Sequence, residues 1–597
     1  MRHCPTQDRY YSPIRLLIMA LGIGVLLSLP AVSQASSDEE ANEAMEQAHH
    51  CLVRGEFEAA LNHINRAVER VPGSAVAYYR RGLILAHAGN LDAALHDFDR
   101  AIDIDPRLAK AYTSRATLHA KRKELDRACG DYAKAIELDP DDPEAPYPYA
   151  SVLFLQGRFA DAMKMIDRAI AVHPTHAPSH LLRGKLLARQ GDPNEALRAY
   201  ARALDSNPEF APAYMERGIV HAAQEDRKKA LDDFDKAIAL DTKDARAYIC
   251  RGDLHGLEGR YRAAIEDFSK ALRLDPGAAD ARYGRANASR FLGDVSSALA
   301  DLDRAIELAP RMCEAYELRG TVRLLQLQSK GITSDFDEKS EPGSTTNDSQ
   351  ARQDANTRRR DCINKSIRDF ETAIRIGAQG VEVHYNHGYA YLMFGDYDRA
   401  IEALNRAIQL DPEHATPAYY RRSHAYFGKG DASREMADLN LAIQIDPRMT
   451  AAYHNRGAFH ANAGDLTAAI EDFTKVIELD PQWEKVFQNR GILFARRGDL
   501  DAALDDLNTA IERDPTSQEA FAARAGVHQG LGNTQPAQAD AARARELAEI
   551  EAERARQSER ARQAERTRPV SQPQQPESPP SEQQPASPRR VYNPLLP

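Results

Sequence analysis

Residues 75–108 read AVAYYRRGLILAHAGNLDAALHDFDRAIDIDPRL, and the fold can be predicted from this stretch. Two segments with helical spacing of apolar residues flank Gly89, and Pro106 ends the second segment. A glycine between two helical patterns suits a tight turn, because glycine tolerates a positive φ. The stretch therefore predicts two helices joined as an antiparallel hairpin.

The same pattern recurs along most of the chain with a period of 34 residues. Prolines in the position of Pro106 stand at 72, 106, 140, 174, 208, 276, 310, 412, 447, 481 and 515. In this register fourteen units run from residue 41 to about residue 547. The 597 residues are therefore better explained by one repetitive array than by a single ordinary core.

Small residues occupy fixed positions in each unit. The position of Gly82 holds glycine in eight units, alanine in five and serine in one. Glycine inside a helix costs about 1 kcal/mol relative to alanine. Its recurrence therefore indicates that a neighbouring helix passes too close for a larger side chain. The positions of Ala94 and Ala101 are nearly always alanine, which gives the second helix a matching small face.

Eight positions carry a resemblance to a known family: Tyr78, Gly82, Leu85, Gly89, Ala94, Phe98, Ala101 and Pro106. They are similar to the pattern of the tetratricopeptide repeat (TPR). The resemblance implies an all-α fold, a right-handed superhelical α-solenoid of helix-turn-helix repeats. It also implies a concave groove lined by the first helix of each unit.

One position departs from the TPR pattern. The family has an apolar residue just before the Gly82 position, whereas eleven units here have arginine, and ten of these carry aspartate in the Asp97 position. The two positions lie equally far from the turn, and arginine forms fork-like contacts with carboxylates, so we interpret them as structural pairs. Examples are Arg81 with Asp97, Arg217 with Asp233, Arg251 with Asp267, and Arg456 with Asp472. Arg183 faces Ala199 and is the exception most available to a ligand.

The first 35 residues have the layout of a secretory signal. Three arginines precede an apolar run over residues 16–29, and small residues follow up to Ala35. The run is short for a membrane span, which needs about 20 residues. We expect cleavage near Ala35 and a periplasmic or secreted protein. The alternative is a membrane anchor over residues 16–35, and we expect membrane contact only if this segment stays uncleaved.

The register divides the chain into six parts. They are a signal peptide or anchor at 1–35, units 1 to 8 with the first helix of unit 9 at 36–328, a disordered polar insertion at 329–361, the rest of unit 9 with units 10 to 14 at 362–547, a charged Glu/Arg helix at 548–568, and a disordered Pro/Gln-rich tail at 569–597. The insertion and the tail are expected to be disordered because they are poor in large apolar residues.

Composition and motifs argue against several classes of function. The formal net charge of −11 disfavours nucleic acid as a partner, because an acidic chain repels phosphate groups. The chain has no phosphate loop, dinucleotide fingerprint, nucleophile elbow or HExxH motif. His384 and His387 share a helical face, but His384 fills the Tyr78 position, which favours packing over a metal site. We therefore expect no catalytic residue, no metal and no cofactor.

Candidate binding residues are those that the family resemblance places in the groove. These positions carry little charge but contain aromatic groups, such as Tyr147 with Phe154 and Tyr283 with Phe291. The densest group consists of Tyr385, Tyr389, Met393, Tyr420, His424 and Phe427. Aromatic side chains with polar tips suit peptide or sugar binding, because they offer a large area at low entropy cost. Packing between repeats is the alternative interpretation.

Three functions remain open from the sequence. The first is an exported, non-catalytic scaffold of the cell envelope that binds a protein or peptide in the groove. The second is a component of envelope polysaccharide export or assembly, with polysaccharide as a partner. The third is an enzyme with an unrecognised site, which hydrolytic activity in the pure protein would reveal.

Overall fold

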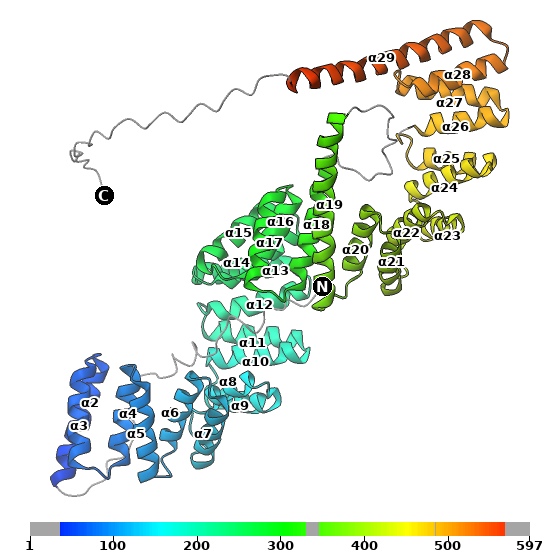
Figure 1. The fold of residues 1–597 in the computed structure, drawn as a ribbon. Coiled ribbons are helices and arrows are strands. Elements are labelled where there is room, and N and C mark those ends of the chain that lie inside the picture. The colour runs from blue at the N-terminus through cyan, green and yellow to red at the C-terminus, as the bar shows by residue number, and fades with distance from the viewer. Residues whose placement is uncertain (1–35, 330–345, 484, 567–597) are drawn as a thin grey trace, which may run out of the picture. The chain divides into compact units, whose positions relative to one another are not determined.

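The computed structural model describes residues 36–329, 346–483 and 485–566. Over these residues the chain forms 28 α-helices and no strand, as the sequence predicts (Figure 1). It divides into two compact units, Met1–Phe394 and Gly395–Pro597. The predicted signal at 1–35 and the predicted tail at 569–597 lie outside the described residues.

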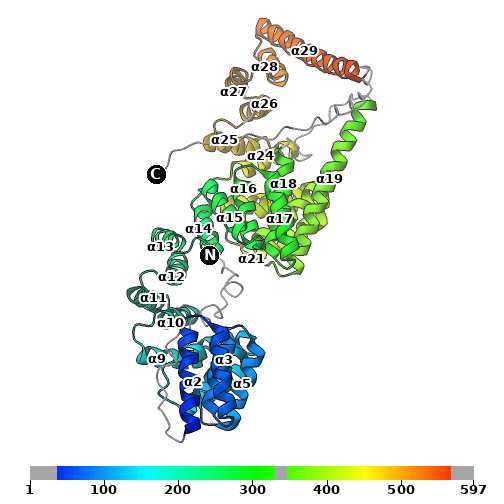
Figure 2. The same cartoon turned by 90° about the vertical axis from the view of Figure 1, so that its left-hand side faces the viewer.

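In its described part, the first unit consists of helix pairs followed by one more helix. The pairs are α2 (Ser36–Val53) with α3 (Phe57–Arg70), α4 (Ala75–His87) with α5 (Leu91–Ile104), α6 (Ala109–Lys121) with α7 (Leu125–Leu138), α8 (Pro146–Leu155) with α9 (Phe159–Val172), α10 (Ala177–Gln190) with α11 (Pro193–Ser206), α12 (Ala211–Ala223) with α13 (Arg227–Leu240), α14 (Ala245–Leu257) with α15 (Tyr261–Leu274), α16 (Ala279–Phe291) with α17 (Val295–Leu308), and α18 (Cys313–Ser329) with α19 (Thr346–Arg375). The last helix is α20 (Val381–Phe394). Successive pairs stack side by side, as Figure 2 shows for α2, α3 and α5.

The second unit begins with a single helix and continues as pairs. The single helix is α21 (Tyr397–Leu410). The pairs are α22 (Thr416–Lys429) with α23 (Ala432–Ile445), α24 (Thr450–Ala463) with α25 (Leu466–Leu479), α26 (Val486–Arg497) with α27 (Leu500–Arg513), and α28 (Gln518–Gly530) with α29 (Thr534–Arg566).

In the hairpins whose short turn is described, one turn residue lies in the left-handed region. Gly89, between α4 and α5, has a φ of +85°, and Asn90 then caps α5 by accepting a hydrogen bond from the backbone of Ala93. Lys123 and Glu225 stand in the same turn position of other hairpins, each with a φ of +64°. The turn geometry therefore persists where the sequence lacks glycine, at some cost in strain.

In several units the small position makes room for an aromatic ring, whereas Gly491 faces Leu507. A Cβ atom on Gly82 would lie 2.7 Å from the Phe98 ring, and one on Gly184 would lie 2.3 Å from the Tyr200 ring. Phe98 is only 1% exposed and belongs to the second helix of the same hairpin. The close approach inferred from the sequence is therefore that of a side-chain ring from the second helix of the hairpin.

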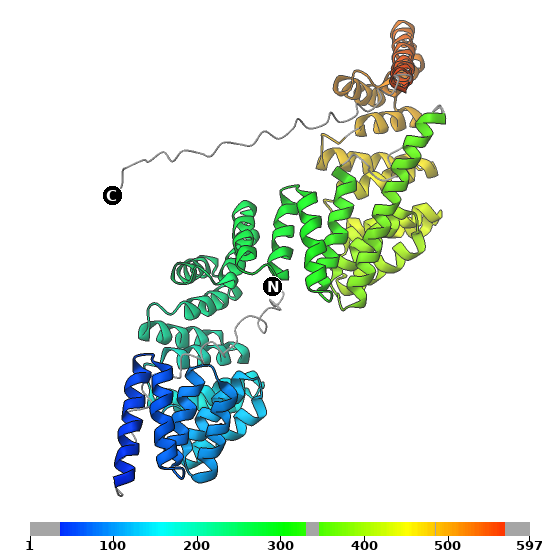
Figure 3. The ribbon, with the colours of Figure 1, turned by 60° about the vertical axis from the view of Figure 1, so that its left-hand side comes forward.

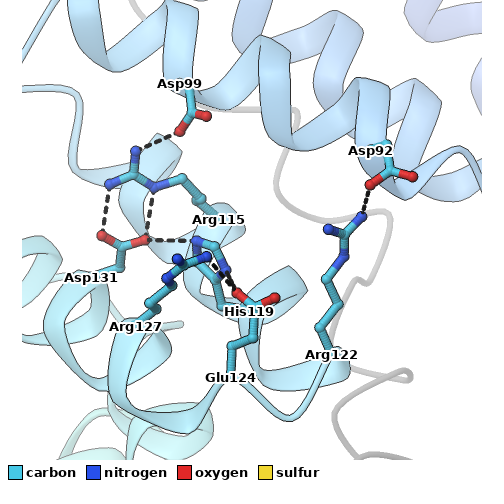
Figure 4. Close-up of polar contacts among 8 residues, drawn as sticks. All are labelled: Asp92, Asp99, Arg115, His119, Arg122, Glu124, Arg127 and Asp131. Carbon is cyan, nitrogen blue, oxygen red and sulfur yellow. Dashed lines mark hydrogen bonds and ion pairs between the residues drawn. The ribbon is translucent and has the colours of Figure 1, made fainter.

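In each of the ten pairs identified in the sequence, the arginine and the aspartate lie within hydrogen-bond distance of each other. In every pair the arginine Nε and Nη2 donate to the two carboxylate oxygens, over N–O distances of 2.6 to 3.1 Å. Figure 4 shows this two-pronged contact for Arg115 and Asp131. The hydrogen bonds with Asp97 raise the pKa of Arg81, because they stabilise the charged guanidinium.

The same arginines also connect neighbouring hairpins. In nine of the ten described pairs the remaining Nη1 donates to a side chain on the second helix of the preceding hairpin. Arg115, for example, bonds Asp99 at 2.7 Å (Figure 4). In most of these units the guanidinium also lies over an aromatic ring of its own helix, as Arg81 does over Tyr78 at 5.3 Å. Each of these nine arginines thus joins three helices.

Arg183 has a partner in the preceding hairpin. Its own hairpin offers Ala199 instead of an aspartate, but its Nη1 lies 3.4 Å from the Asp167 carboxylate of the preceding hairpin. Arg183 therefore keeps the connection between hairpins, and its contact with a ligand stays a prediction.

Two long helices also differ from the predicted boundaries. The insertion at 329–361 was expected to be disordered, yet α19 starts at Thr346 and continues to Arg375, and it extends past its neighbours in Figure 3. Residues 347–360 are rich in Gln, Ala and Arg, which favour helix even without a core to pack on. Residues 330–345 lie outside the described part. The charged helix predicted at 548–568 is the continuation of α29, which ends at Arg566.

Replacing the arginine of one pair by lysine should loosen its hairpin. In Arg490→Lys the single ammonium group cannot contact both Asp506 oxygens and Thr474 at once, so we expect a loss of about 1 to 3 kcal/mol in the opening free energy of α26 and α27. Hydrogen exchange of peptides from these helices measures it. Arg496→Lys, at an exposed site on the same helix, is the matched control. Equal exchange in the two variants would refute a structural role for the pair.

Candidate functional site

A pocket of about 90 Å³ opens between four consecutive first helices, α8, α10, α12 and α14. One residue of its lining, Tyr200, comes from the second helix α11 and is buried. Apolar side chains and charged side chains both line the pocket. The lining consists of Tyr147, Ser151, Phe154, Pro178, Leu181, Leu182, Lys185, Ala188, Arg189, Tyr200, Glu216, Ile219, Val220 and Arg246.

One carboxylate in this pocket joins three hairpins. Glu216 of α12 lies 3.0 Å from the Lys185 ammonium of α10 and 3.3 Å from the Arg246 guanidinium of α14. The three side chains are only 12% to 19% exposed. Burial by itself would raise the pKa of Glu216, but the attraction of Lys185 and Arg246 outweighs it and lowers the pKa. Glu216 is therefore ionised at neutral pH, and the charges of the pocket are fixed.

Besides Lys185 and Arg246, a third cation, Arg189, lines the pocket and packs against two aromatic rings. The Arg189 guanidinium lies 5.3 Å from the ring centres of both Phe154 and Phe159. These two rings meet edge to face at 5.6 Å. Lys185, Arg189 and Arg246 together against Glu216 give the lining a net charge of +2.

The pocket lies where the series of arginine and aspartate pairs is interrupted. The hairpin of α8 and α9 has Tyr149 and Met165 in the two positions, and the hairpin of α10 and α11 has Ala199 in place of aspartate. Tyr149 instead stacks on Tyr132 with ring centres 5.8 Å apart. The ion pairs of Glu216 supply a polar connection between first helices in this region.

Sequence reasoning found the aromatic side of this pocket and missed its charges. Tyr147 and Phe154 were singled out as one groove group, and both line the pocket. The expectation that groove positions carry little charge is wrong here, because Lys185 and Arg189 occupy two of those positions on α10 and Arg246 occupies a third on α14. The signal that the sequence offers is Lys185 itself, because Ser151 and Ile219 stand in the same position of the neighbouring units.

The six groove candidates of units ten and eleven do not share one compact unit. Tyr385, Tyr389 and Met393 lie on α20, the last helix of the first unit, and Met393 is 8% exposed. A buried side chain of this kind offers little area to a partner. Tyr420, His424 and Phe427 lie on α22 of the second unit.

The candidates on α22 take part in an internal network. Asn455 of α24 lies 2.9 Å from His424 Nε2 and 3.3 Å from the Tyr420 hydroxyl. The rings of Tyr420 and His424 meet edge to face at 4.5 Å. Burial and the charge of Arg421 lower the pKa of His424 to about 4, so its ring is neutral and Nε2 accepts the Asn455 hydrogen bond. Phe427 is 56% exposed and remains on the surface.

No group of three or more His, Cys, Asp or Glu side chains in the described residues is arranged to hold a metal ion. His384 and His387, considered as a metal pair from the sequence, both lie on α20. His387 packs against Tyr391, with ring centres 4.6 Å apart.

Comparison with family models identifies TPR sequences over most of the described chain. Models described as "Tetratricopeptide repeat" match residues 45–109, 119–186, 181–245, 251–324, 381–414, 416–449 and 450–483. The matches do not delimit every unit, so the count of fourteen stays a prediction. No curated protein sequence matches the chain.

Several solved structures resemble the chain in fold. YrrB, described as a TPR protein with an unusual peptide-binding site, is 25% identical over 31% of this chain and 95% of its own, with a TM-score of 0.28. The Cut9–Hcn1 hetero-tetramer matches with 11% identity over 77% of this chain and 96% of that one, with a TM-score of 0.41. PilF of Pseudomonas aeruginosa is 20% identical over 35% and 95%, with a TM-score of 0.32.

The neutral state of His424 predicts a pH dependence. Its pKa is depressed on folding, so its stabilising effect is complete above the unfolded pKa near 6.5 and is lost as the pH falls towards 4. Between about pH 7 and about pH 5 the opening free energy of α22 should fall by up to about 2 kcal/mol, as seen by hydrogen exchange corrected for intrinsic rates. His424→Gln should reduce this fall, while His414→Gln, at an exposed site, should not. An unchanged fall in His424→Gln would contradict the assignment.

Proposed function

The chain belongs to the tetratricopeptide repeat family, and we propose that it is a non-catalytic scaffold of the cell envelope that binds a protein or peptide along its first helices. TPR proteins are generally scaffolds that mediate binding to proteins or peptides. Stacked repeats create a surface much longer than any single hairpin, and binding along such a surface is the usual function of solenoids.

The pocket between α8 and α14 is the observation that carries this proposal. Its lining comes from four hairpins in sequence, so a ligand that fills it crosses several repeats. The lining combines Tyr147, Phe154 and Leu181 with the charged groups of Lys185 and Arg246. Apolar area with a few fixed polar groups is typical of a binding site, because the apolar part supplies affinity and the polar part selects the ligand.

The envelope location rests on the sequence of the first 35 residues. Their basic start, apolar run and small residues near Ala35 match an export signal. Among the described helices, none combines the length and the hydropathy that a bilayer span requires.

A photo-crosslinking side chain placed in the pocket should capture the partner. Introduced at Ala188, in the pocket lining, it should give an adduct in cells, whereas the same group at Arg202, exposed on the second helix α11, should give none. Mass spectrometry of the adduct identifies its chemistry. A polypeptide adduct supports the proposal; an adduct that resists protease and contains sugar would instead favour polysaccharide handling. No adduct at Ala188, or equal adducts at both sites, would refute binding on this face.

Export predicts a processed chain. Protein purified from the envelope fraction of a bacterium with two membranes should begin near Ser36, because cleavage follows the small residues that end at Ala35. Amino-terminal sequencing measures this directly. Protein that retains Met1 and sediments with membranes would favour an anchor over residues 16–35, and protein that retains Met1 in the cytoplasm would refute export.

A further inference from the structure

We propose that the pocket lined by Lys185, Arg189 and Arg246 binds an acidic peptide segment, with a carboxylate side chain next to an apolar side chain that enters the pocket. This inference rests on the proposed scaffold function and specifies the chemistry of its ligand. It concerns the hairpins of α8 to α14 and none of the aromatic candidates on α20 and α22.

The charge of the pocket selects an anion. Three cations and one carboxylate line it, and the low exposure of Lys185, Glu216 and Arg246 places these charges in surroundings of reduced dielectric constant. A net positive cleft with apolar walls concentrates the field that an approaching carboxylate meets. Glu216 holds the Lys185 and Arg246 head groups at fixed positions, so a ligand does not have to order them on binding.

These cations are not part of the repeat architecture. The arginines of the structural pairs recur in ten units, and each is hydrogen-bonded to the aspartate of its own hairpin. In contrast, the position of Lys185 is Leu83, Thr117 and Ser151 in the three preceding units and Ile219 in the next. The fold therefore does not require a cation there, and the cluster is particular to this stretch.

The pocket is small. Its volume of about 90 Å³ is well below the several hundred Å³ of a typical cofactor site. Leu181, Ile219 and Tyr147 surround this space. An aliphatic or aromatic side chain fits such a space, whereas a uronic acid sugar, which also carries carboxylates, has no comparable apolar group.

Beyond α14 the charges are mixed. Burial, together with the charge of Asp280 on α16, raises the pKa of Asp253 on α14 to about 7. Burial also raises the pKa of Tyr283 on α16; Glu314 and Glu317 of α18 raise it further, and the charge of Arg290 on α16 opposes them. The net positive charge that attracts an acidic segment therefore belongs to the pocket itself.

Fluorescence anisotropy of the full chain with short labelled peptides tests this inference. The probe carries tetramethylrhodamine and alternates aspartate with leucine and phenylalanine; matched probes have asparagine or lysine in place of each aspartate. We expect the aspartate probe to bind about ten-fold more tightly than the asparagine probe, and the lysine probe more weakly still. The preference should shrink as salt rises.

Variants separate a binding role from a structural one. Lys185→Gln and Arg246→Gln should each remove most of the preference for aspartate, while Arg202→Gln, an exposed charge on α11, should not change it. Glu216→Gln removes the one negative charge of the lining and keeps a hydrogen-bond acceptor. It should therefore raise the affinity for the aspartate probe several-fold. A purely structural ion pair predicts the opposite, namely unchanged or weaker binding. Circular dichroism confirms that each variant is folded.

The outcomes distinguish this inference from the proposed function. An adduct at Ala188 combined with equal affinity for the aspartate and asparagine probes would overturn the carboxylate assignment and leave the scaffold function standing. Absence of both adduct and probe binding would overturn both. An oligomer of a uronic acid that displaces the aspartate probe at lower concentration than the unlabelled peptide would overturn the peptide assignment.

Discussion

The half-buried guanidinium that precedes the small position in eleven units is the group that the array depends on. It donates two hydrogen bonds to an aspartate of its own hairpin and, in most units, a third to the preceding hairpin, and it often covers an aromatic ring. A charge in this environment is tolerated only when its partners are present, since an unpaired buried charge costs several kcal/mol. This explains why arginine and aspartate occur together: the units with Gln47, Tyr149 and His387 lack both.

Features that repeat with the unit could be predicted from the sequence, because each is a local constraint observed many times. The Gly89 turn, the Gly82 position and the pairing of Arg81 with Asp97 are of this kind. The Gly82 contact was attributed to a helix, whereas the Phe98 ring fills the space. This ring could have been found, because an aromatic residue follows most of these glycines sixteen residues later.

Features that occur once could not be predicted in the same way. The charged pocket arises from Lys185, Glu216 and Arg246 in three different units, so its members are separated by about thirty residues and none is unusual within its own helix. The sequence does not predict the start of α19 at Thr346, because a polar composition indicates disorder, although many residues of this segment favour helix. Single-sequence patterns identify what is shared between units better than what distinguishes one unit.

Two of the polar contacts that recur between helices are absent around α11, and their absence has a mechanical consequence. Ala199 replaces the aspartate that would join α10 to α11, and Ala201 stands where neighbouring units offer a polar side chain to the next arginine. In a linear array each hairpin is held only by its neighbours, so the strength of the whole under tension is that of its least connected joint. A pull along the first unit would therefore strain the hairpins of α8 to α11, where these contacts are missing. The pocket borders these hairpins. A ligand bound across α8 to α14 would add contacts between them and so resist their separation.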